Sequence, residues 1–257
     1  MNTQTRQQAP TQTSSALKVA LVTGGSRGIG AAIVEQLAAD GFAVAINYAG
    51  RREDAEALAA RIEAAGGSAV ALQADVADAV AVQRLYDAVE ARFGGVDVLV
   101  NNAGIMSLAP VAQFSDADFD RLIAINLKGS FNAMREAARR VRDGGRIINL
   151  STSVVGLRLE NYGVYSATKA AVEALTGILS KELRGKSITV NAVAPGPTAT
   201  DLFLDGKSPE LIDRMAKMNP LERLGTPADI ANVVAFLASP QGGWVNGQIL
   251  RANGGMI

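Results

Sequence analysis

The strongest constraint on the fold is the regular alternation of short apolar runs with longer amphipathic segments along nearly the whole chain. The apolar runs predict strands at about 19–23, 43–47, 69–73, 96–101, 146–150, 188–194 and 248–251. The amphipathic segments predict helices at about 28–40, 51–65, 77–93, 115–142 and 162–183, and one more after the Thr226–Pro227 cap. Repeated strand–helix units form parallel sheets, because a parallel pair needs a crossover connection. We therefore expect an α/β protein, a single-domain doubly wound parallel sheet of the Rossmann type with helices on both faces.

Composition narrows the roles open to such a fold. The 257 residues include 25 basic and 25 acidic side chains, so the formal net charge is zero, which disfavours a broad nucleic-acid or anionic-membrane surface. The chain has no His and no Cys, which disfavours a metal site and removes disulfides. No apolar run approaches the length of a membrane span. We expect a cytoplasmic protein whose partner is a small molecule.

Two stretches depart from the alternating pattern. Residues 1–16 are rich in Gln, Thr and Ser and lack a hydrophobic run, which predicts a disordered tail before a domain at 17–257. Residues 195–224 form a long irregular stretch, and such loops in compact domains usually serve a function. We place a substrate loop at about 197–222. Its apolar residues either cover the substrate or simply pack the loop down: Leu202, Phe203, Leu204 and Met215.

Glycine-rich or polar segments directly follow five of the predicted strands. They lie at 24–30, 75–76, 101–104, 151–153 and 195–196. The carboxyl ends of parallel strands share one edge of the sheet, and ligands bind at that edge. Each segment alone resembles an ordinary turn, but five on one edge predict a ligand site.

The first of these segments has glycines at spacings suited to a phosphate group. Thr23-Gly24 is followed by Gly28 and Gly30, a T-G-x-x-x-G-x-G pattern between a strand and a helix. Glycines let the backbone approach a diphosphate, and the helix N-terminus supplies free N–H groups. A tight strand–helix turn has the same composition, so this segment alone leaves both interpretations open.

A second feature is the pair Tyr165 and Lys169, which are four residues apart in a predicted helix and so share one face. An ammonium group beside a phenol favours the phenolate and lowers its pKa from about 10. Because the chain lacks His and Cys, proton transfer must use Tyr, Lys or a carboxylate. The pair therefore predicts a general acid–base site, although such spacing also arises by chance on helices.

Taken in order, these motifs resemble those of the short-chain dehydrogenase/reductases. The resemblance rests on the glycine pattern, on Asn101-Asn102-Ala103-Gly104, on Tyr165 and Lys169, and on Pro195-Gly196. It extends from about residue 18 to the C-terminus and, within the family, is greatest to the 3-oxoacyl-[acyl-carrier-protein] reductases and their broad-specificity relatives. It implies hydride transfer between a nicotinamide cofactor and a carbonyl or secondary alcohol.

The resemblance also implies a role for each catalytic residue. Tyr165 would be the general acid in reduction and the base in oxidation, and Lys169 would hold the ribose and lower the Tyr165 pKa. Ser153 would hydrogen-bond the substrate oxygen, because Ser153-Val154-Val155-Gly156 matches the family pattern, with Ser151 as the alternative. Asn126 would anchor a proton relay to Lys169.

The cofactor residues follow from the same resemblance. Those around the diphosphate are Gly24, Ser26, Arg27, Gly28, Ile29 and Gly30. Those of the adenosine half are Asn47, Tyr48, Asp75 and Val76, and those of the ribose are Asn102, Ala103 and Gly104, with Tyr165 and Lys169. Those at the nicotinamide end are Pro195, Gly196 and Thr198.

The stretch after the second strand predicts the choice of cofactor. NAD-binding proteins of this kind place a carboxylate there for the ribose 2′-hydroxyl. Residues 47–52 contain no acid, and Glu53 is the first. A 2′-phosphate would meet no repulsion, and Arg27 and Arg51 are available to pair with it. We predict NADP(H) in preference to NAD(H).

The sequence is compatible with more than one substrate class and more than one oligomeric state. One candidate is a carbonyl reductase, with 3-oxoacyl thioesters among its possible substrates, and another is a dehydrogenase of sugars, polyols or other secondary alcohols. A nucleotide-binding regulatory protein is a third, disfavoured by the intact catalytic set. The family resemblance implies a homodimer or homotetramer through the helices near 116–142 and 162–183.

Overall fold

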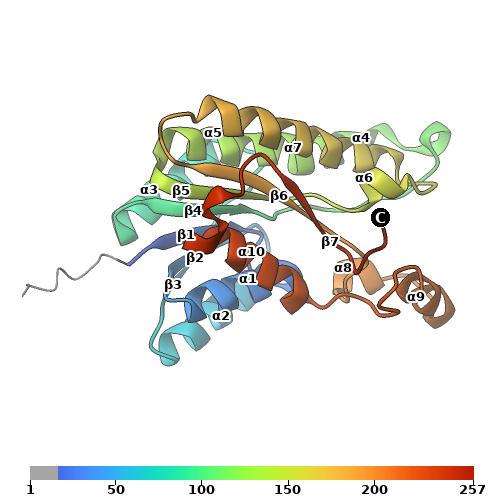
Figure 1. The fold of residues 1–257 in the computed structure, drawn as a ribbon, viewed down its shortest axis with the longest axis horizontal. Helices are drawn as coiled ribbons and strands as arrows, with labels where there is room; N and C mark the ends of the chain where they lie inside the picture. The colour runs from blue at the N-terminus through green and yellow to red at the C-terminus, as the bar shows by residue number, and fades with distance from the viewer. Residues whose placement is uncertain (1–16) are drawn as a thin grey trace, which may run out of the picture.

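Seven parallel strands form one sheet in the computed structural model, which describes residues 17–257. The order across the sheet is β3-β2-β1-β4-β5-β6-β7 (Figure 1). The strands are β1 (Val19–Thr23), β2 (Ala43–Tyr48), β3 (Ser68–Gln73), β4 (Val96–Asn101), β5 (Val141–Leu150), β6 (Thr189–Pro195) and β7 (Ile249–Ala252). The predicted tail at 1–16 lies outside the described residues.

Helices cover both faces of this sheet. The α-helices are α1 (Gly28–Ala39), α2 (Arg52–Ala64), α3 (Ala79–Phe93), α4 (Asp116–Leu122), α5 (Ser130–Arg140), α6 (Val154–Leu157), α7 (Gly163–Glu182), α8 (Asp201–Leu204), α9 (Pro209–Ala216) and α10 (Pro227–Ala238). Two 3₁₀-helices are η1 (Val111–Gln113) and η3 (Pro240–Trp244), and a π-helical segment is η2 (Ile123–Gly129). Figure 1 shows α1, α2 and α10 on one face and α3, α5 and α7 on the other. Together, sheet and helices confirm the predicted Rossmann-like fold.

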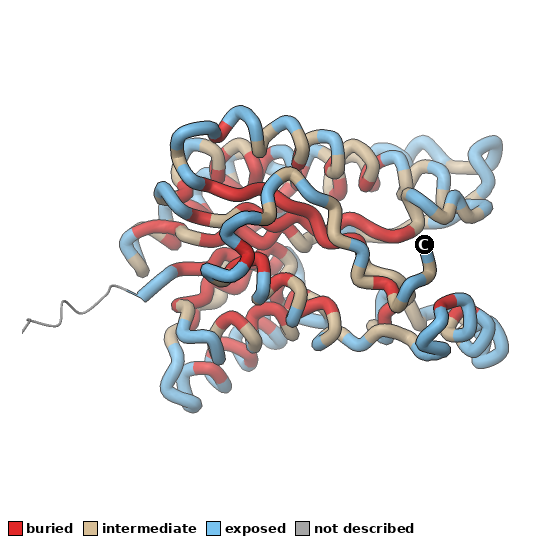
Figure 2. The backbone as a smooth tube through the Cα atoms, in the orientation of Figure 1, coloured by how far each residue is buried: buried red, intermediate tan, exposed pale blue. Residues whose placement is uncertain are grey.

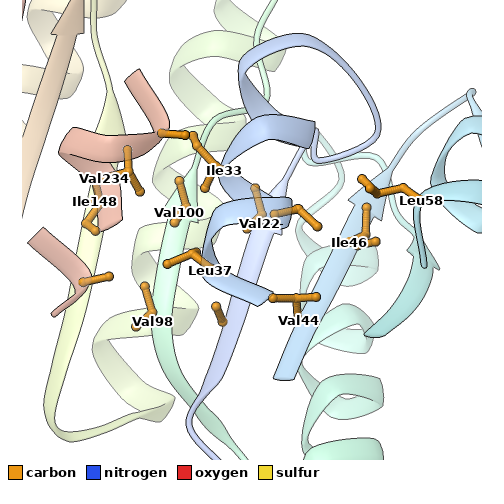
Figure 3. Packing of buried hydrophobic residues seen from close by; sticks show 14 of the residues in the cluster. Val22, Ile33, Leu37, Val44, Ile46, Leu58, Val98, Val100, Ile148 and Val234 are labelled. Atoms are coloured by element: carbon orange, nitrogen blue, oxygen red, sulfur yellow. The ribbon is translucent and has the colours of Figure 1, made fainter. Parts of the chain in front are cut away.

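The core forms two layers because successive residues of a strand point to opposite faces. In β1, Ala20 and Val22 pack with α1, α2 and α10, whereas Val19 and Leu21 pack with α3 and α5. Figure 3 shows the first layer, in which side chains from α1 lie over β1, β2 and β4. The central strands are buried along their length in Figure 2. Burial on both faces explains why these strands are continuous apolar runs.

The strand order reverses between β1 and β4. From β1 the chain builds outward through β2 and β3, and from β4 it builds in the other direction. The loops that leave the carboxyl ends of β1 and β4 therefore diverge and leave a crevice, which is where open α/β sheets bind ligands. The glycine segment and residues 101–104 lie at this point.

The stretch predicted to be mostly helical at 115–142 is helical from Asp116 to Arg140 in the structure, as α4, η2 and α5. The Ser115 cap accepts a hydrogen bond from Asp118 N, as its sequence predicts, and starts α4. The chain then widens into the π-helical segment η2 before α5, which ends at Arg140. β5 begins at Val141, five residues before the predicted strand. A π-helical turn is a bulge within a helix and does not end it, so the three segments follow one another as a single helical stretch.

The stretch predicted to be irregular at 195–224 holds two short helices. Thr200 caps α8 and Ser208 caps α9, which has Pro209 in its first turn. These are the same signals that correctly predict Thr226 and Pro227 at the start of α10. Within residues 17–257 no helix combines the length and the apolar character that crossing a bilayer requires.

Candidate active site

The glycine segment after β1 is bound tightly to the segment after β4. Asn102 Nδ2 donates to the carbonyl oxygens of Thr23 and Gly24 at 3.0 and 2.9 Å. Gly24 has a φ of +61°, which favours glycine. A Cβ on Gly30 would overlap the Gly24 carbonyl oxygen and would lie 2.6 Å from Asn102 Nδ2. The close approach of these two segments therefore depends on the absence of a side chain at Gly30.

The predicted residues of the diphosphate and adenosine sites line one hollow. It is bordered by Gly24, Ser26, Arg27, Gly28, Ile29, Gly30, Asn47, Tyr48, Arg51, Asp75, Val76, Asn102, Ala103 and Gly104, among others. Arg27 and Arg51 are exposed on its rim, whereas Asn47 is buried. Asn47 Oδ1 accepts from Gly24 N at 3.3 Å, and Asn47 Nδ2 donates to Ala74 O at 3.0 Å. Asn47 thus also positions the glycine segment from behind.

Two hydrogen bonds fix the end of this hollow that lies at Asp75 and Val76, after β3. Asp75 accepts from Ala77 N at 2.9 Å, and Val76 is held by Asn132, whose Nδ2 donates to Val76 O at 2.9 Å. A Cβ on Gly129 would lie 2.6 Å from Val76 Cγ2, so the helix passes close behind Val76. The hollow therefore extends from the glycine segment to a preformed wall at Asp75 and Val76, at the edge of the sheet where such folds bind ligands.

Tyr165 and Lys169 lie near the start of α7 and line a second cleft beside the hollow. Lys169 is 5% exposed, and its Nζ donates to Leu150 O, the last residue of β5, at 2.8 Å. Tyr162 packs edge-on against Tyr165, with ring centroids 6.4 Å apart. The helix therefore delivers both side chains to one wall of the cleft, as their spacing predicts.

The expected effect on the Tyr165 pKa is not what the structure shows. Tyr165 keeps some exposed surface, but burial of its phenol raises its pKa to about 12. The Thr152 hydroxyl beside the phenol acts in the opposite direction and lowers that pKa, but burial dominates. The helical spacing of Tyr165 and Lys169 does not reveal this desolvation, which depends on what packs around the phenol.

Burial of Lys169 has a consequence for stability. It lowers the Lys169 pKa from 10.5 to about 8, because the ammonium is desolvated. Between about pH 8 and 10.5 the unfolded chain binds more protons at this residue than the folded chain, so stability rises with pH there. We expect the unfolding free energy of wild type, relative to Lys169→Met, to rise by on the order of 2 kcal/mol between pH 7 and 10.5. Denaturant titrations of both proteins without cofactor would test this, and a pH-independent difference would contradict it.

Asn126 lies in the π-helical segment η2 and is fully buried. Its Nδ2 donates to Ile105 O and its Oδ1 accepts from Ile105 N, both at 2.9 Å. A Cβ on Gly104 would lie 3.4 Å from Asn126 Oδ1 and 3.5 Å from Lys169 Nζ. Asn126 and Lys169 therefore approach the same point beside Gly104, and Asn126 fixes the loop after β4.

Three consecutive hydroxyl groups follow β5, and each has different partners. Ser151 Oγ donates to Glu173 Oε1 at 2.6 Å. Ser153 Oγ donates to Ala194 O at 3.0 Å and accepts from Asn253 Nδ2 at 3.0 Å. Thr152 Oγ1 accepts from Val154 N at 3.3 Å. All three residues line the cleft.

The nicotinamide end predicted from Pro195, Gly196 and Thr198 also lines this cleft. Thr198 Oγ1 donates to Gly196 O at 2.9 Å. A Cβ on Gly196 would lie 2.9 Å from Asn253 Cα, so the C-terminal segment packs directly on the end of β6. Asn253 had no recognisable signal in the sequence, because its partner Ser153 is 100 residues away.

The walls of the cleft are mostly apolar. They include Met106, Leu157, Leu159, Leu202, Phe203, Met215, Met218 and Met256. Three of the four predicted lid residues are in this set, whereas Leu204 lines a neighbouring surface hollow instead. Of the described residues that line the cleft, Lys169 has the single charged side chain. Residues 17–257 bring no three His, Cys, Asp or Glu side chains into a metal-binding arrangement.

The fold and these two adjoining cavities define a class: an α/β protein of the dinucleotide-binding type, with Tyr165 and Lys169 in a cleft beside the crevice at the carboxyl edge of its sheet. Residues 24–257 match the family model described as enoyl-(acyl carrier protein) reductase. A "short-chain type dehydrogenase/reductase" from Picea abies is 47% identical over 250 residues, covering 93% of this chain and 92% of that protein. The chain belongs to the short-chain dehydrogenase/reductase family, as its motifs predict.

Two further relatives are informative. "NADPH-dependent aldehyde reductase 2, chloroplastic" from Arabidopsis thaliana is 45% identical over 255 residues, covering 93% of this chain and 94% of that protein. A short-chain dehydrogenase from Burkholderia cenocepacia, solved in complex with NADP, superposes with a TM-score of 0.88 at 41% identity, covering 93% of this chain and 97% of the other.

Proposed function

We propose that this protein is an NADP(H)-dependent reductase of uncharged, apolar aldehydes or ketones, which also works in reverse on the matching alcohols. One observation carries the proposal: Tyr165 and Lys169 lie in an otherwise uncharged, largely apolar cleft that adjoins a glycine-lined dinucleotide hollow. Proton donors in an apolar cleft suit a substrate with one polar oxygen on an apolar body.

The choice of NADP(H) is supported by the rim of the hollow and by the relatives. No carboxylate follows β2 before Glu53, and Arg27 and Arg51 border the adenosine half. Arginine pairs well with a phosphate. The Arabidopsis relative is described as NADPH-dependent, and the Burkholderia structure holds NADP.

A double substitution tests this choice. We expect Arg27→Ala/Arg51→Ala to raise KM for NADPH at least about tenfold, because two charge-assisted contacts to the 2′-phosphate are lost, each worth about 1.5–3 kcal/mol. KM for NADH should change less than about threefold. Steady-state kinetics with both cofactors would show the split, and Arg61→Ala, which removes an exposed ion pair with Glu35 on α1, is the matched control. Equal effects on both cofactors would refute the assignment.

In the proposed mechanism, different residues of the cleft donate the proton and stabilise the charge on the substrate oxygen. NADPH, held by the residues of the hollow and by Pro195, Gly196 and Thr198, would supply the hydride for the carbonyl carbon. Tyr165 donates its phenolic proton to the substrate oxygen, so the carbonyl gains one hydride and one proton and leaves as an alcohol. A hydroxyl from residues 151–153 donates a second hydrogen bond to the same oxygen, and together they stabilise the charge that develops there.

Lys169 and Asn126 support the proton transfer in this proposal. The buried Lys169 ammonium lies close enough to Gly104 and Asn126 to link the cleft to the loop after β4. In this proposal its charge favours the phenolate that remains after donation, against the effect of burial, which raises the Tyr165 pKa. Asn126 holds that loop through its two hydrogen bonds to Ile105.

The lining of the cleft separates the candidate substrates. A sugar or polyol needs several polar partners, and an acyl-carrier-protein thioester needs cationic residues for its phosphopantetheine arm. The described lining offers methionines, leucines and aromatic rings instead. We therefore rank apolar aldehydes and ketones first, 3-oxoacyl thioesters second, and polyols third.

A panel assay tests this ranking. NADPH consumption would be measured with hexanal, benzaldehyde and an acetoacetyl thioester, and NADP⁺ reduction with sorbitol, at matched concentrations. We expect the highest kcat/KM for the apolar aldehydes. A thioester value well above the aldehydes would make the protein an acyl-chain reductase, and a dominant polyol activity would make it a dehydrogenase. NADPH binding with no turnover of any substrate would favour a nucleotide-binding regulatory protein.

We also propose a homodimer or homotetramer that packs through α5 and α7, and a cytoplasmic location. Apolar side chains on this side of the molecule are exposed in the chain itself: Phe119, Phe131 and Ile178. Light scattering that showed a monomer would exclude the assembly. The Arabidopsis relative is described as chloroplastic, so location differs among relatives and needs direct imaging.

A further inference from the structure

The hydroxyl that binds the substrate oxygen must have a proton free to donate, because a carbonyl or alkoxide oxygen only accepts. A Ser or Thr hydroxyl has one proton and two acceptor positions. The three hydroxyls after β5 can therefore be separated by asking where each proton goes.

The Ser151 and Ser153 hydroxyls each already donate a hydrogen bond within the protein. Ser151 Oγ lies 2.6 Å from Glu173 Oε1, and Ser153 Oγ lies 3.0 Å from Ala194 O. Both partners are acceptors, since one is a carboxylate and the other a backbone carbonyl, so the serines must be the donors. Asn253 Nδ2 donates to Ser153 at the same time, which fixes its orientation from the C-terminal segment. Turning Ser153 to a substrate would leave the buried Ala194 carbonyl without this partner.

Thr152 is placed differently. Its Oγ1 accepts from Val154 N, which leaves the proton available. Among residues 17–257, no acceptor takes that proton in a hydrogen bond of fixed geometry, and the hydroxyl lies beside the Tyr165 phenol, whose pKa it lowers. Thr152 is 9% exposed against 2% for Ser153, so it is also the more accessible of the two from the cleft.

We propose that Thr152, and not Ser153, donates the second hydrogen bond to the substrate carbonyl oxygen beside Tyr165. Ser153 then has a positioning role, in which it joins the end of β5 to β6 and to the C-terminal segment. This inference rests on the proposed carbonyl reductase function. It also explains why the phenol and the Thr152 hydroxyl adjoin each other, since both must reach one oxygen atom.

Four variants test the assignment under identical conditions, with wild-type reduction of an apolar aldehyde measured first. Thr152→Val keeps the shape and removes the hydroxyl, and Thr152→Ser restores it. Ser153→Ala removes the rival hydroxyl. Thr189→Val is the matched control, because its buried hydroxyl lies at the amino end of β6 and has no hydrogen-bond partner in residues 17–257.

We expect Thr152→Val to lose about 10²–10³ in kcat, as when one oxyanion donor is removed. Its NADPH Kd should stay within about threefold of wild type, and Thr152→Ser should recover kcat to within about tenfold. Ser153→Ala should lose less kcat than Thr152→Val and should instead unfold at a lower temperature, because a buried pair of hydrogen bonds is lost. Thr189→Val should keep the wild-type kcat.

A larger loss of kcat in Ser153→Ala than in Thr152→Val, or full activity in Thr152→Val, would overturn the inference. If Thr152→Val does not fold, Thr152→Ala and the size of the Ser153→Ala loss decide between the two residues. Failure of wild type to reduce any carbonyl would instead count against the proposed function, so the two failures can be told apart.

Discussion

Replacing Tyr165 with Phe should abolish most of the turnover and leave cofactor binding intact. The substitution removes only the phenolic hydroxyl, which is the proposed proton donor in a cleft where the other described ionisable groups are Lys169 and Tyr162. General acid catalysis typically contributes about 10² to 10⁴ in rate, so kcat should fall by that factor. The NADPH Kd should stay within about threefold of wild type, because the ring remains in place. Steady-state kinetics and a fluorescence titration with NADPH measure the two quantities.

The same chemical change at Tyr86 provides the control. Tyr86 is fully buried on α3, and its hydroxyl donates to Ala133 O at 3.2 Å, away from the cleft. Tyr86→Phe should cost about 1 kcal/mol of stability through that hydrogen bond and should leave kcat unchanged. Near wild-type turnover in Tyr165→Phe would remove Tyr165 from the mechanism. A similar loss of kcat in both variants would point to folding instead of chemistry.

The second large effect is expected from Gly30→Ala. The new Cβ would overlap the Gly24 carbonyl oxygen and crowd Asn102 Nδ2. To relieve this overlap, the glycine segment that we propose as the diphosphate site must move. That movement strains the Asn102–Gly24 hydrogen bond, which is 2.9 Å long. We expect a loss of about 1–3 kcal/mol in stability and an NADPH Kd raised at least about tenfold.

Thermal unfolding with and without NADPH measures both consequences. Wild type should gain stability on adding NADPH, and Gly30→Ala should gain much less at the same concentration. Gly177→Ala is the control, because this glycine lies within α7, and a Cβ there would meet no atom within 4 Å. It should raise stability by about 0.5–1 kcal/mol, since Ala favours a helix over Gly. A Gly30→Ala protein with wild-type NADPH affinity would show that the segment does not form the diphosphate site.

Local patterns determined the fold. The apolar runs at 19–23 and 96–101 coincide with β1 and β4, and most other predicted strands agree with the structure within one or two residues. The strands could be predicted because buried parallel strands are continuous apolar runs. The helices that connect them could be predicted because their apolar residues recur about every 3.6 residues. The two short helices α8 and α9 were missed although Ser208 and Pro209 carry the signals of a helix start. Their helical patterns are too short to stand out from a loop.

The edge of the sheet that holds the site could also be foreseen. The glycine segment, Asn101–Gly104 and the hydroxyl segment each follow a strand, and parallel topology brings such segments together without knowledge of side chains. The pairing of Tyr165 with Lys169 follows from the helical repeat alone. These statements depend only on neighbours in sequence or on strand direction.

What each group does in the site was decided by contacts between distant residues. Burial, and not the Tyr165–Lys169 spacing, determines the direction of both pKa shifts. The choice between Ser153 and Thr152 depends on Ala194 and on Asn253, which lies 100 residues further along the chain. Hydrogen-bond partners and desolvation are properties of a three-dimensional neighbourhood, so the sequence named the candidate groups, and only the tertiary structure showed which of their protons are free.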